Sequence, residues 1–508
     1  FIVLVDNFGC PLICKTVCWC DLFQGTLVGR FLQLEEDVEG LFPTGERYRN
    51  GKKEGTMRFA KLFAVLVVVV FSASSAMAAG FRLPEAGAKA MGMGFAFTAQ
   101  ADDPSAIYFN PAGIIQLEGT NVMAGTTFVK LNGGEFTGTT PLTYGATVTE
   151  TQKDLNFFIP NMYLTKKVSP NFAYGVGIFA PFGLGQEYQD RNASIFRTAV
   201  TKIDLQTVVI NPTVAWKVND VLSVGAGIDY MFGKAKLART SVINNAVPPA
   251  SSPLNLYNLD LKGDGDAWAY NFGLLLKPSP NWKVGFSYRS PFTLEIKDGD
   301  VSIINISTAA IVAAGGAPGT FAGVVKPAGS DNTSTSFTTK ATTTLRMPAT
   351  AALGIAYTRD RLTVETDLDI TFWHSWKRLD IDIQQQGALL ADINSARNWK
   401  DVTAFRIGAE YRVTDPLALR AGFVYDPTPV PAETMDAFLP DATRLNYTVG
   451  AGYKYKNWTF DGSYLYVDKR DRTVNNQTSG SFPSYGAGFN GKWSGDSHLV
   501  AFDVAYKF

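Results

Sequence analysis

Cysteine, histidine and net charge are all scarce in this sequence, and each shortage narrows the range of functions. The four cysteines lie within the first twenty residues, and the only histidines are His374 and His498. Most metal sites and Ser/His/Asp catalytic centres need such side chains. The 46 basic and 46 acidic residues give a formal charge of zero, which argues against a nucleic-acid partner. We therefore expect no enzyme, no cofactor and no bound metal.

Long apolar runs are missing as well, so the sequence contains no candidate for a membrane-spanning helix. The single marked run, Leu62–Phe71, is too short for that purpose. It follows the basic residues Arg58 and Lys61 and precedes the small-residue signal Ala76-Met77-Ala78. This layout is typical of a secretory signal peptide, which we place at residues 57–78.

The segment before this signal, residues 1–56, is interpreted as an upstream extension read from a start codon placed too early. A signal peptide must emerge first from the ribosome, so nothing should precede it. The mature chain would then begin at Ala79 and contain no cysteine. An exported chain without a later apolar run is either secreted or inserted into a membrane as a β-barrel.

Apolar and polar residues alternate along many later segments. Leu362, Val364, Thr366, Leu368 and Ile370 share one face, whereas Thr363, Glu365, Asp367 and Asp369 share the other. A period of two places alternate side chains on opposite faces of a sheet. A soluble β-sandwich or propeller shows the same alternation. Charges on one face and aromatic residues near strand ends favour a membrane barrel with a wet lumen.

The connections between these segments alternate in length. Short turns are expected at 167–171, 219–220, 279–281, 359–360, 414–416 and 456–457, and long connections at 131–155, 238–266, 296–336, 377–402, 426–443 and 467–497. Short periplasmic turns and long external loops are typical of outer-membrane proteins. We therefore predict an all-β fold, a transmembrane antiparallel barrel of about fourteen strands over residues 120–508.

The two ends of the mature chain carry further signals. The final segment alternates from Val500 to Phe508 and stops on the aromatic residue, which predicts a partner in the barrel assembly machinery. Residues 79–119 do not alternate; they contain several glycines and a short helical pattern after Asp102-Asp103-Pro104. A compact segment before the first strand predicts an N-terminal plug of short helices, a hatch, inside the lumen.

Several short motifs, in order, resemble the FadL family of long-chain fatty acid outer-membrane transporters, which includes aromatic-hydrocarbon transporters of the TodX type. They are Ala79-Gly80-Phe81, the Asn110-Pro111-Ala112 centre of Ala101–Gly113, Ala180–Leu184, Asn211-Pro212, Val221–Gly227, Val284–Ser290, Leu345–Thr350 and Pro429–Ala432. Together they extend over essentially the whole mature chain.

The resemblance implies a fourteen-stranded barrel plugged by a hatch with a gating motif at Asn110, Pro111 and Ala112. It also implies passive uptake of hydrophobic molecules through a lateral opening at a kink in the third strand. That strand would run from Phe172 to about Leu184, with the kink at Ala180, Pro181, Phe182 and Gly183. Proline lacks the N–H group that completes a ladder, which is consistent with a kink.

Candidate ligand-binding residues are apolar residues of the external loops and the hatch. They are Ile243, Leu256, Ile311, Val312 and Phe321 in the loops, and Phe81, Phe95, Phe97, Ile107, Tyr108 and Phe109 in the hatch. Packing within a lid or plug explains the same residues equally well. A carboxylate ligand would need a cation, and Arg406, Arg412 and Arg420 are lumen-facing candidates among which the sequence does not choose.

We therefore expect a passive transporter of long-chain fatty acids or similar apolar compounds in the outer membrane of a Gram-negative bacterium. Its other partners would be outer-membrane lipid and lipopolysaccharide. Uptake of aromatic or alkane hydrocarbons on the same scaffold is the alternative. A polar-solute porin or a surface adhesin is the alternative from another class.

Overall fold

The computed structural model describes residues 80–143, 145–243, 254–305, 307, 336–384, 390, 392–476 and 488–508. They belong to one compact unit, Val67–Phe508. The expected extension at 1–56 and signal peptide at 57–78 lie outside the described residues, as do the loop candidates Ile311, Val312 and Phe321.

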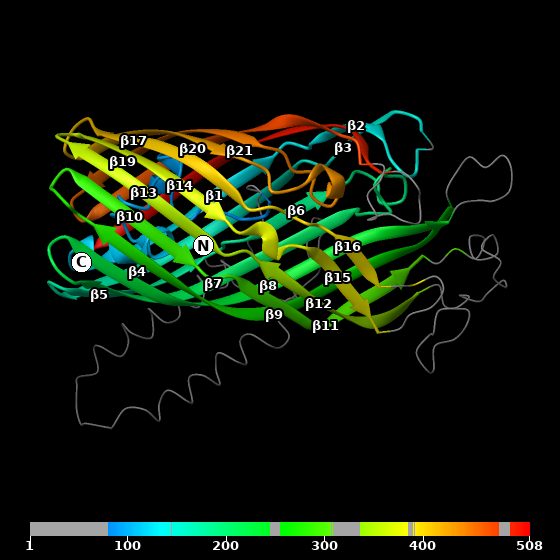
Figure 1. Ribbon diagram of the computed structural model, residues 1–508, viewed down its shortest axis with the longest axis horizontal. Coiled ribbons are helices and arrows are strands. Elements are labelled where there is room, and N and C mark those ends of the chain that lie inside the picture. Colours follow the sequence, from blue (N-terminus) through cyan, green and yellow to red (C-terminus); the bar gives the residue numbers. More distant parts are fainter. Residues whose placement is uncertain are drawn as a thin grey trace, which may run out of the picture. The chain divides into compact units, whose positions relative to one another are not determined.

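Antiparallel strands close into a barrel within this unit (Figure 1). In order around the wall, the strands are β1 (Thr120–Leu131), β4 (Leu155–Ser169), β5 (Phe172–Phe179) with β6 (Gly183–Glu187), β7 (Lys202–Lys217), β8 (Leu222–Ile243), β9 (Leu254–Leu276), β10 (Trp282–Arg289) with β11 (Phe292–Ile304), β13 (Thr350–Arg359) with β12 (Phe337–Met347), β14 (Leu362–Thr371) with β15 (Arg378–Ile383), β17 (Val402–Arg412) with β16 (Ile393–Ala396), β18 (Leu417–Asp426), β19 (Arg444–Tyr455), β20 (Trp458–Val474) and β21 (Asn490–Lys507). Counting each interrupted pair once, this is a ring of 14 strands.

The ring closes because β1 pairs along its whole length with both β4 and the last strand, β21. A small hairpin of β2 (Glu135–Thr139) and β3 (Val148–Thr151) extends the wall at the end where the long connections lie. The short turns and the C-terminus gather at the other end, which is therefore the periplasmic end. The predicted fold class is confirmed.

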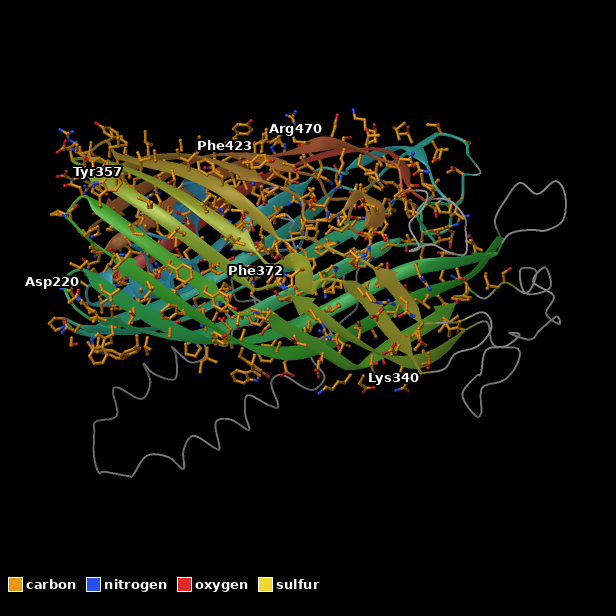
Figure 2. The ribbon with its side chains drawn as sticks, in the orientation of Figure 1. Asp220, Lys340, Tyr357, Phe372, Phe423 and Arg470 are labelled. Carbon is orange, nitrogen blue, oxygen red and sulfur yellow. The ribbon has the colours of Figure 1, made fainter. Side chains whose placement is uncertain are left out.

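The two faces of the wall differ as the alternation predicted. Val449 on β19 and Phe502 on β21 point outward and are 56% and 52% exposed, whereas Glu365 and Asp503 point inward and are 0% and 1% exposed. Aromatic side chains such as Tyr357 project from the wall near the periplasmic end, where Asp220 also lies (Figure 2). An apolar outer band between polar ends is the surface that a lipid bilayer requires.

The prediction of a loop at Ala238–Asp266 was wrong in part, because β8 continues to Ile243 and β9 already begins at Leu254. The long connection at 377–402 likewise contains the hairpin of β15 and β16. The outer faces of β8 and β9 carry Lys234 and Asp264 here, a cross-strand pair that hid the strand pattern. Beyond the lipid the outer face can be charged while the backbone pairing continues.

The helices of the described residues are short: α3 (Ala88–Gly92), α4 (Ala106–Phe109) and the 3₁₀ turns η2 (Pro111–Gln116), η3 (Trp373–Ser375) and η4 (Ala432–Thr434). None of the helices in this part of the chain has the length and apolarity needed to cross a membrane. The first three belong to the hatch, whose residues from Gly80 to Ile115 are almost all buried.

Candidate functional site

Carboxylates of the barrel wall hold the hatch by its backbone. On β14, Glu365 accepts hydrogen bonds from the amides of Ala99 and Gln100 at 2.6 and 2.9 Å. One step along the same face, Asp367 accepts from the amides of Phe97 and Thr98, both at 3.0 Å. Buried backbone donors without partners are costly, so this ladder fixes the middle of the hatch to one strand.

Asn110 is the second anchor between the hatch and the wall. It is fully buried, and its side-chain amide donates to the carbonyl oxygens of Thr98 at 2.7 Å and Leu274 at 2.9 Å. Its Oδ1 atom accepts from the amide of Ala112 at 3.1 Å, which caps the 3₁₀ turn that begins at Pro111. The side chain therefore ties two hatch segments and β9 together.

Glycines of the wall allow the hatch backbone to lie directly on the strands. We call these the glycine belt: Gly225 on β8, Gly273 on β9, Gly285 on β10, Gly354 on β13, Gly408 on β17, Gly422 on β18 and Gly450 on β19. At Gly408 a Cβ atom would collide with the carbonyl of Met93, and at Gly273 with the side chain of Asn110. On both sides of β14, these strands thus meet the plug without intervening side chains, which leaves little space between the plug and this part of the wall.

The third wall strand breaks where the sequence predicted a kink. β5 ends at Phe179 and β6 begins at Gly183. Between them, the carbonyl oxygen of Pro181 accepts a hydrogen bond from the amide of Leu83 at 2.8 Å, and the amide of Gly183 donates to the carbonyl oxygen of Phe81 at 2.9 Å. The strand therefore turns inward and pairs with the start of the hatch.

This inward turn leaves a break in the ladder of the wall. β4 pairs with β5 only as far as Met162, opposite Ile178. Beyond that point, the Leu155–Asn161 stretch of β4 pairs with β1 on one side, while β6 pairs with β7. Pairing is restored at the outer end, where the amide of Lys153 donates to the carbonyl oxygen of Glu187 at 2.9 Å. We call the interval between β4 and β6 the wall gap.

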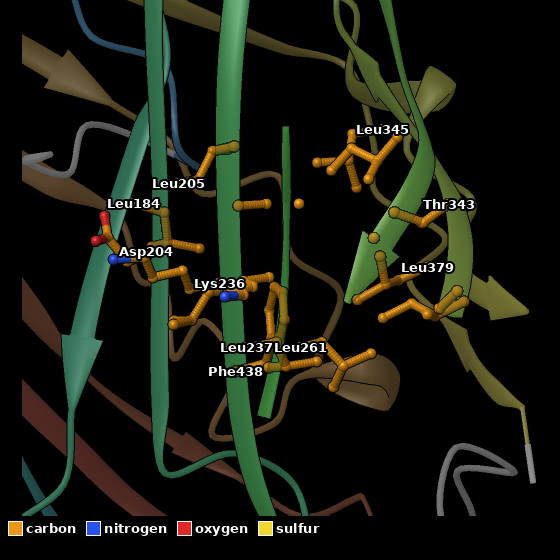
Figure 3. A pocket seen from close by; sticks show the side chains of 18 of the residues that line it. Leu184, Asp204, Leu205, Lys236, Leu237, Leu261, Thr343, Leu345, Leu379 and Phe438 are labelled. Carbon is orange, nitrogen blue, oxygen red and sulfur yellow. The ribbon is translucent and has the colours of Figure 1, made fainter. Parts of the chain in front are cut away.

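An apolar cavity of about 690 Å³ occupies the lumen on the extracellular side of the hatch (Figure 3). Its aliphatic and aromatic lining comes from seven wall strands, two connections between strands and the hatch: Leu184, Ile203, Leu205, Leu237, Leu261, Ile296, Leu345, Leu379, Ile381, Trp376, Phe438 and Phe81. In Figure 3, Leu205 and Leu184 face Leu345 and Leu379 across the space. The charged lining residues are Asp204, Lys236, Lys262 and Asp300, of which Lys262 and Asp300 form an ion pair at 3.6 Å.

A second, more polar cavity of about 480 Å³ lies against the kink. Pro181 and Phe182 line it together with Arg82 and Arg406. Both arginines pair with Asp369 of β14, Arg406 at 2.9 Å. This cavity therefore has a buried charge cluster, in which two arginines share one carboxylate, where the first cavity has aliphatic side chains.

The hatch candidates separate into three groups. Phe81 lines the large apolar cavity, with its ring 4.8 Å from that of Trp373 and 5.0 Å from that of Trp376. Tyr108 and Phe109 line the polar cavity. Phe95, Phe97 and Ile107 line neither; they are buried in the packing of the hatch, where Phe97 contacts Phe109 and Ile107 fills the space beside Gly175 and Gly177.

The two loop candidates among the described residues, Ile243 and Leu256, lie in strands rather than loops. Leu256 is a buried residue of β9, 1% exposed, and does not line either cavity. Ile243 is the last residue of β8, where its backbone pairs with Leu254. Apart from Phe81, the lining of the apolar cavity comes from residues that sequence reasoning missed, although the change of the inward face from polar to aliphatic, as at Leu205, Leu237 and Leu261, could have identified many of them.

Burial also affects one acidic side chain of the hatch. Glu85 is 4% exposed, and its Oε2 atom has no hydrogen-bond partner among the described residues. Removal from water raises the pKa of Glu85 to about 7, because the charged form is disfavoured, and the nearby Arg444 and Arg406 oppose the shift only in part. The group therefore exchanges its proton near neutral pH.

Comparison with known proteins identifies the family. A sequence profile described as outer membrane protein transport protein (OMPP1/FadL/TodX) matches residues 69–508. The chain belongs to this family. A long-chain fatty acid transport protein of Escherichia coli O6:H1 (strain CFT073) is 25% identical over 409 residues, which cover 77% of this chain and 87% of that protein. Outer membrane protein P1 of Haemophilus influenzae is 26% identical over 437 residues, 78% of this chain and 88% of that protein.

Solved structures share the fold of this OMPP1/FadL/TodX family member. A Pseudomonas aeruginosa FadL homologue superposes with a TM-score of 0.66 at 20% identity, over 85% of this chain and 100% of that one. The Ralstonia pickettii toluene transporter TbuX gives 0.56 at 20% identity, over 83% and 98%. The chain is therefore an outer-membrane barrel protein, as the sequence predicted.

Proposed function

We propose that the protein carries long-chain fatty acids or similar hydrophobic compounds passively across the outer membrane, and that they leave sideways through the wall gap. The observation that carries the proposal is the aliphatic cavity that ends at Phe81, the hatch residue paired with the kinked strand. Family relatives named for the transport of fatty acids and of toluene support the same class of cargo.

A dry path suits this cargo for an energetic reason. Burying a chain of about fifteen methylenes gains roughly 12 kcal/mol, at ~0.8 kcal/mol per CH₂. A water-filled pore would lose much of this gain at every step. The glycine belt leaves little room between the hatch and most of the wall, whereas the ladder is already interrupted at the wall gap. Exit into the lipid through the wall gap therefore requires a smaller rearrangement than passage between the hatch and the rest of the wall.

Replacement of Pro181 by valine tests the exit route. Valine restores a backbone N–H and favours a continuous strand, so β6 should pair with β4 and close the wall gap. We expect the uptake of oleate by whole cells to fall severalfold, with the amount of folded barrel unchanged on heat-modifiability gels. Pro212→Val in the uninterrupted strand β7 is the matched control and should leave uptake near that of the unmodified protein. Normal uptake by Pro181→Val would contradict the lateral route.

Hydrocarbons form the second candidate class of cargo, because the cavity lining is aliphatic and the relatives include a toluene transporter. Competition between oleate and toluene for uptake separates the two classes. A large and steady ion conductance in planar bilayers would instead indicate an open polar pore.

A further inference from the structure

Most of the positively charged side chains that the structure describes in the lumen have a carboxylate of the protein itself as a partner. Arg406 pairs with Asp369, and Arg420 pairs with Glu410 and Asp461 at 2.6 and 2.7 Å. Arg82, Lys89, Arg289, Arg397 and Arg444 also have acidic partners within 4.0 Å. Of the arginines suggested by the sequence, Arg412 is exposed at the periplasmic end, where it donates to the carbonyl oxygen of Asp360. Of the three candidates, Arg406 and Arg420 are therefore already paired with carboxylates, and Arg412 does not line either of the two cavities described above.

Lys469 differs from these residues. It lies on β20 in the extracellular half of the barrel, is partly buried, and follows the inward-facing residues Leu465 and Val467 in the alternation of that strand. Among the described residues, its ammonium group has no hydrogen-bond or ion-pair partner. The nearby carboxylate of Asp441 pairs instead with Arg444, the cross-strand neighbour of Lys469, which also pairs with Asp426.

The position of Lys469 links this free charge to the wall gap. A cavity of about 400 Å³ is lined by Lys469 together with Leu155 of β4 and Gly185, Gln186 and Glu187 of β6, the strands that border the gap. Lys469 thus lines a cavity that also touches the strands on both sides of the proposed exit.

The other charged residues lining this cavity already have partners. Glu187 accepts ion pairs from both Lys153 and Lys202, at 2.6 and 2.7 Å, which leaves an excess of positive charge around it. Asp496 accepts a hydrogen bond from Asn132 at 2.6 Å and lies 3.2 Å from His498. Of the two lysines that line the cavity, Lys153 already pairs with Glu187, whereas Lys469 has no carboxylate within ion-pair distance among the described residues.

We propose that Lys469 binds the carboxylate of an amphiphilic cargo as its apolar tail reaches the wall gap. This inference rests on the proposed function and refines it, because it selects fatty acids over neutral hydrocarbons. Lysine offers three N–H donors and no acceptor, and a hydrogen bond between charged groups is among the stronger ones in proteins. Lys469 would therefore affect which cargo is bound and not the route by which the cargo leaves the barrel.

The test compares oleate with oleyl alcohol, which has the same tail and no charge. Lys469→Met should weaken oleate binding to the purified protein about tenfold, the loss expected for one charge-assisted hydrogen bond. Binding of oleyl alcohol should not change, and Lys469→Arg should retain oleate binding. Lys492→Met is the matched control, since Lys492 is an exposed residue of β21 paired with Asp471.

Unchanged oleate binding by Lys469→Met, or an equal loss for both ligands, would overturn the role of Lys469 while the transport proposal stands. Failure of the unmodified protein to bind either ligand would overturn the proposed function, and the role of Lys469 with it. Heat-modifiability gels report in each case whether the variant barrel is folded.

Discussion

Asn110 shows how a single side chain can serve the hatch and the wall at once. Its amide nitrogen and oxygen make three hydrogen bonds in a site from which water is excluded. An amide offers donors and an acceptor at nearly the same point, which an aspartate or a leucine of similar size cannot do. The resemblance placed this residue in a hatch motif, but the partner strand β9 could be named only from the structure.

Asn110→Ala should loosen the hatch without unfolding the barrel. Loss of the side chain leaves the buried carbonyls of Thr98 and Leu274 without this donor, at a cost of about 1–3 kcal/mol each. We expect faster hydrogen exchange of hatch amides, measured by mass spectrometry in detergent. Asn121→Ala is the control, because the Asn121 amide donates only to the nearby carbonyl oxygen of Glu118 at the rim. Equal exchange in the two variants would contradict the anchoring role.

At the level of elements, alternation sufficed to predict strands wherever the outer face meets lipid. β14 is the clearest case, since Glu365, Asp367 and Asp369 point inward as predicted. The prediction failed where β8 and β9 extend beyond the lipid, because their outer faces become charged there. The break after Phe179 was placed by the resemblance, and Pro181 alone would have fitted an ordinary strand end.

The candidate site was less predictable than the strands for a physical reason. Cavity residues such as Leu205 and Leu345 come from strands far apart in the sequence, and only the closure of the ring brings them together. The free charge of Lys469 depends on which neighbours are already paired, which is a property of the assembled lumen. Composition and periodicity contain neither kind of information.

The packing of hatch against wall can be tested at the glycine belt. At Gly408 and Gly422, a Cβ atom would collide with the backbone of Met93 and Gly94, which cannot move without shifting the hatch. Gly408→Ala and Gly422→Ala should therefore increase ion conductance in planar bilayers and protease cleavage within the hatch. Gly462→Ala is the control, because the nearest atom to its added methyl group lies 3.9 Å away. Unaltered conductance in both belt variants would mean that the hatch accommodates the added methyl groups without opening a path, which would contradict the prediction.

At the scale of the whole molecule, the ring of strands and its apolar outer band make the protein an integral membrane protein. Val449→Arg places a charge within this band and should destabilise the inserted barrel by about 2–4 kcal/mol. The quantity measured is the denaturant midpoint of the barrel in lipid vesicles. Thr473→Arg near the extracellular end of β20 should change it little, since this exposed site lies outside the apolar band. Equal midpoints for both variants would place Val449 away from lipid.

The anchors of the hatch also set an order of assembly. The amide of Ala88 is held by Asp503 of the last strand, and that of Ala99 by Glu365 of a strand in the second half of the chain. The hatch precedes every strand of the barrel in the chain, yet it can dock in this way only after the strands that hold it have been made and closed. Until then these backbone amides lack their carboxylate partners, so the native arrangement of the hatch is completed late although the hatch comes early in the chain.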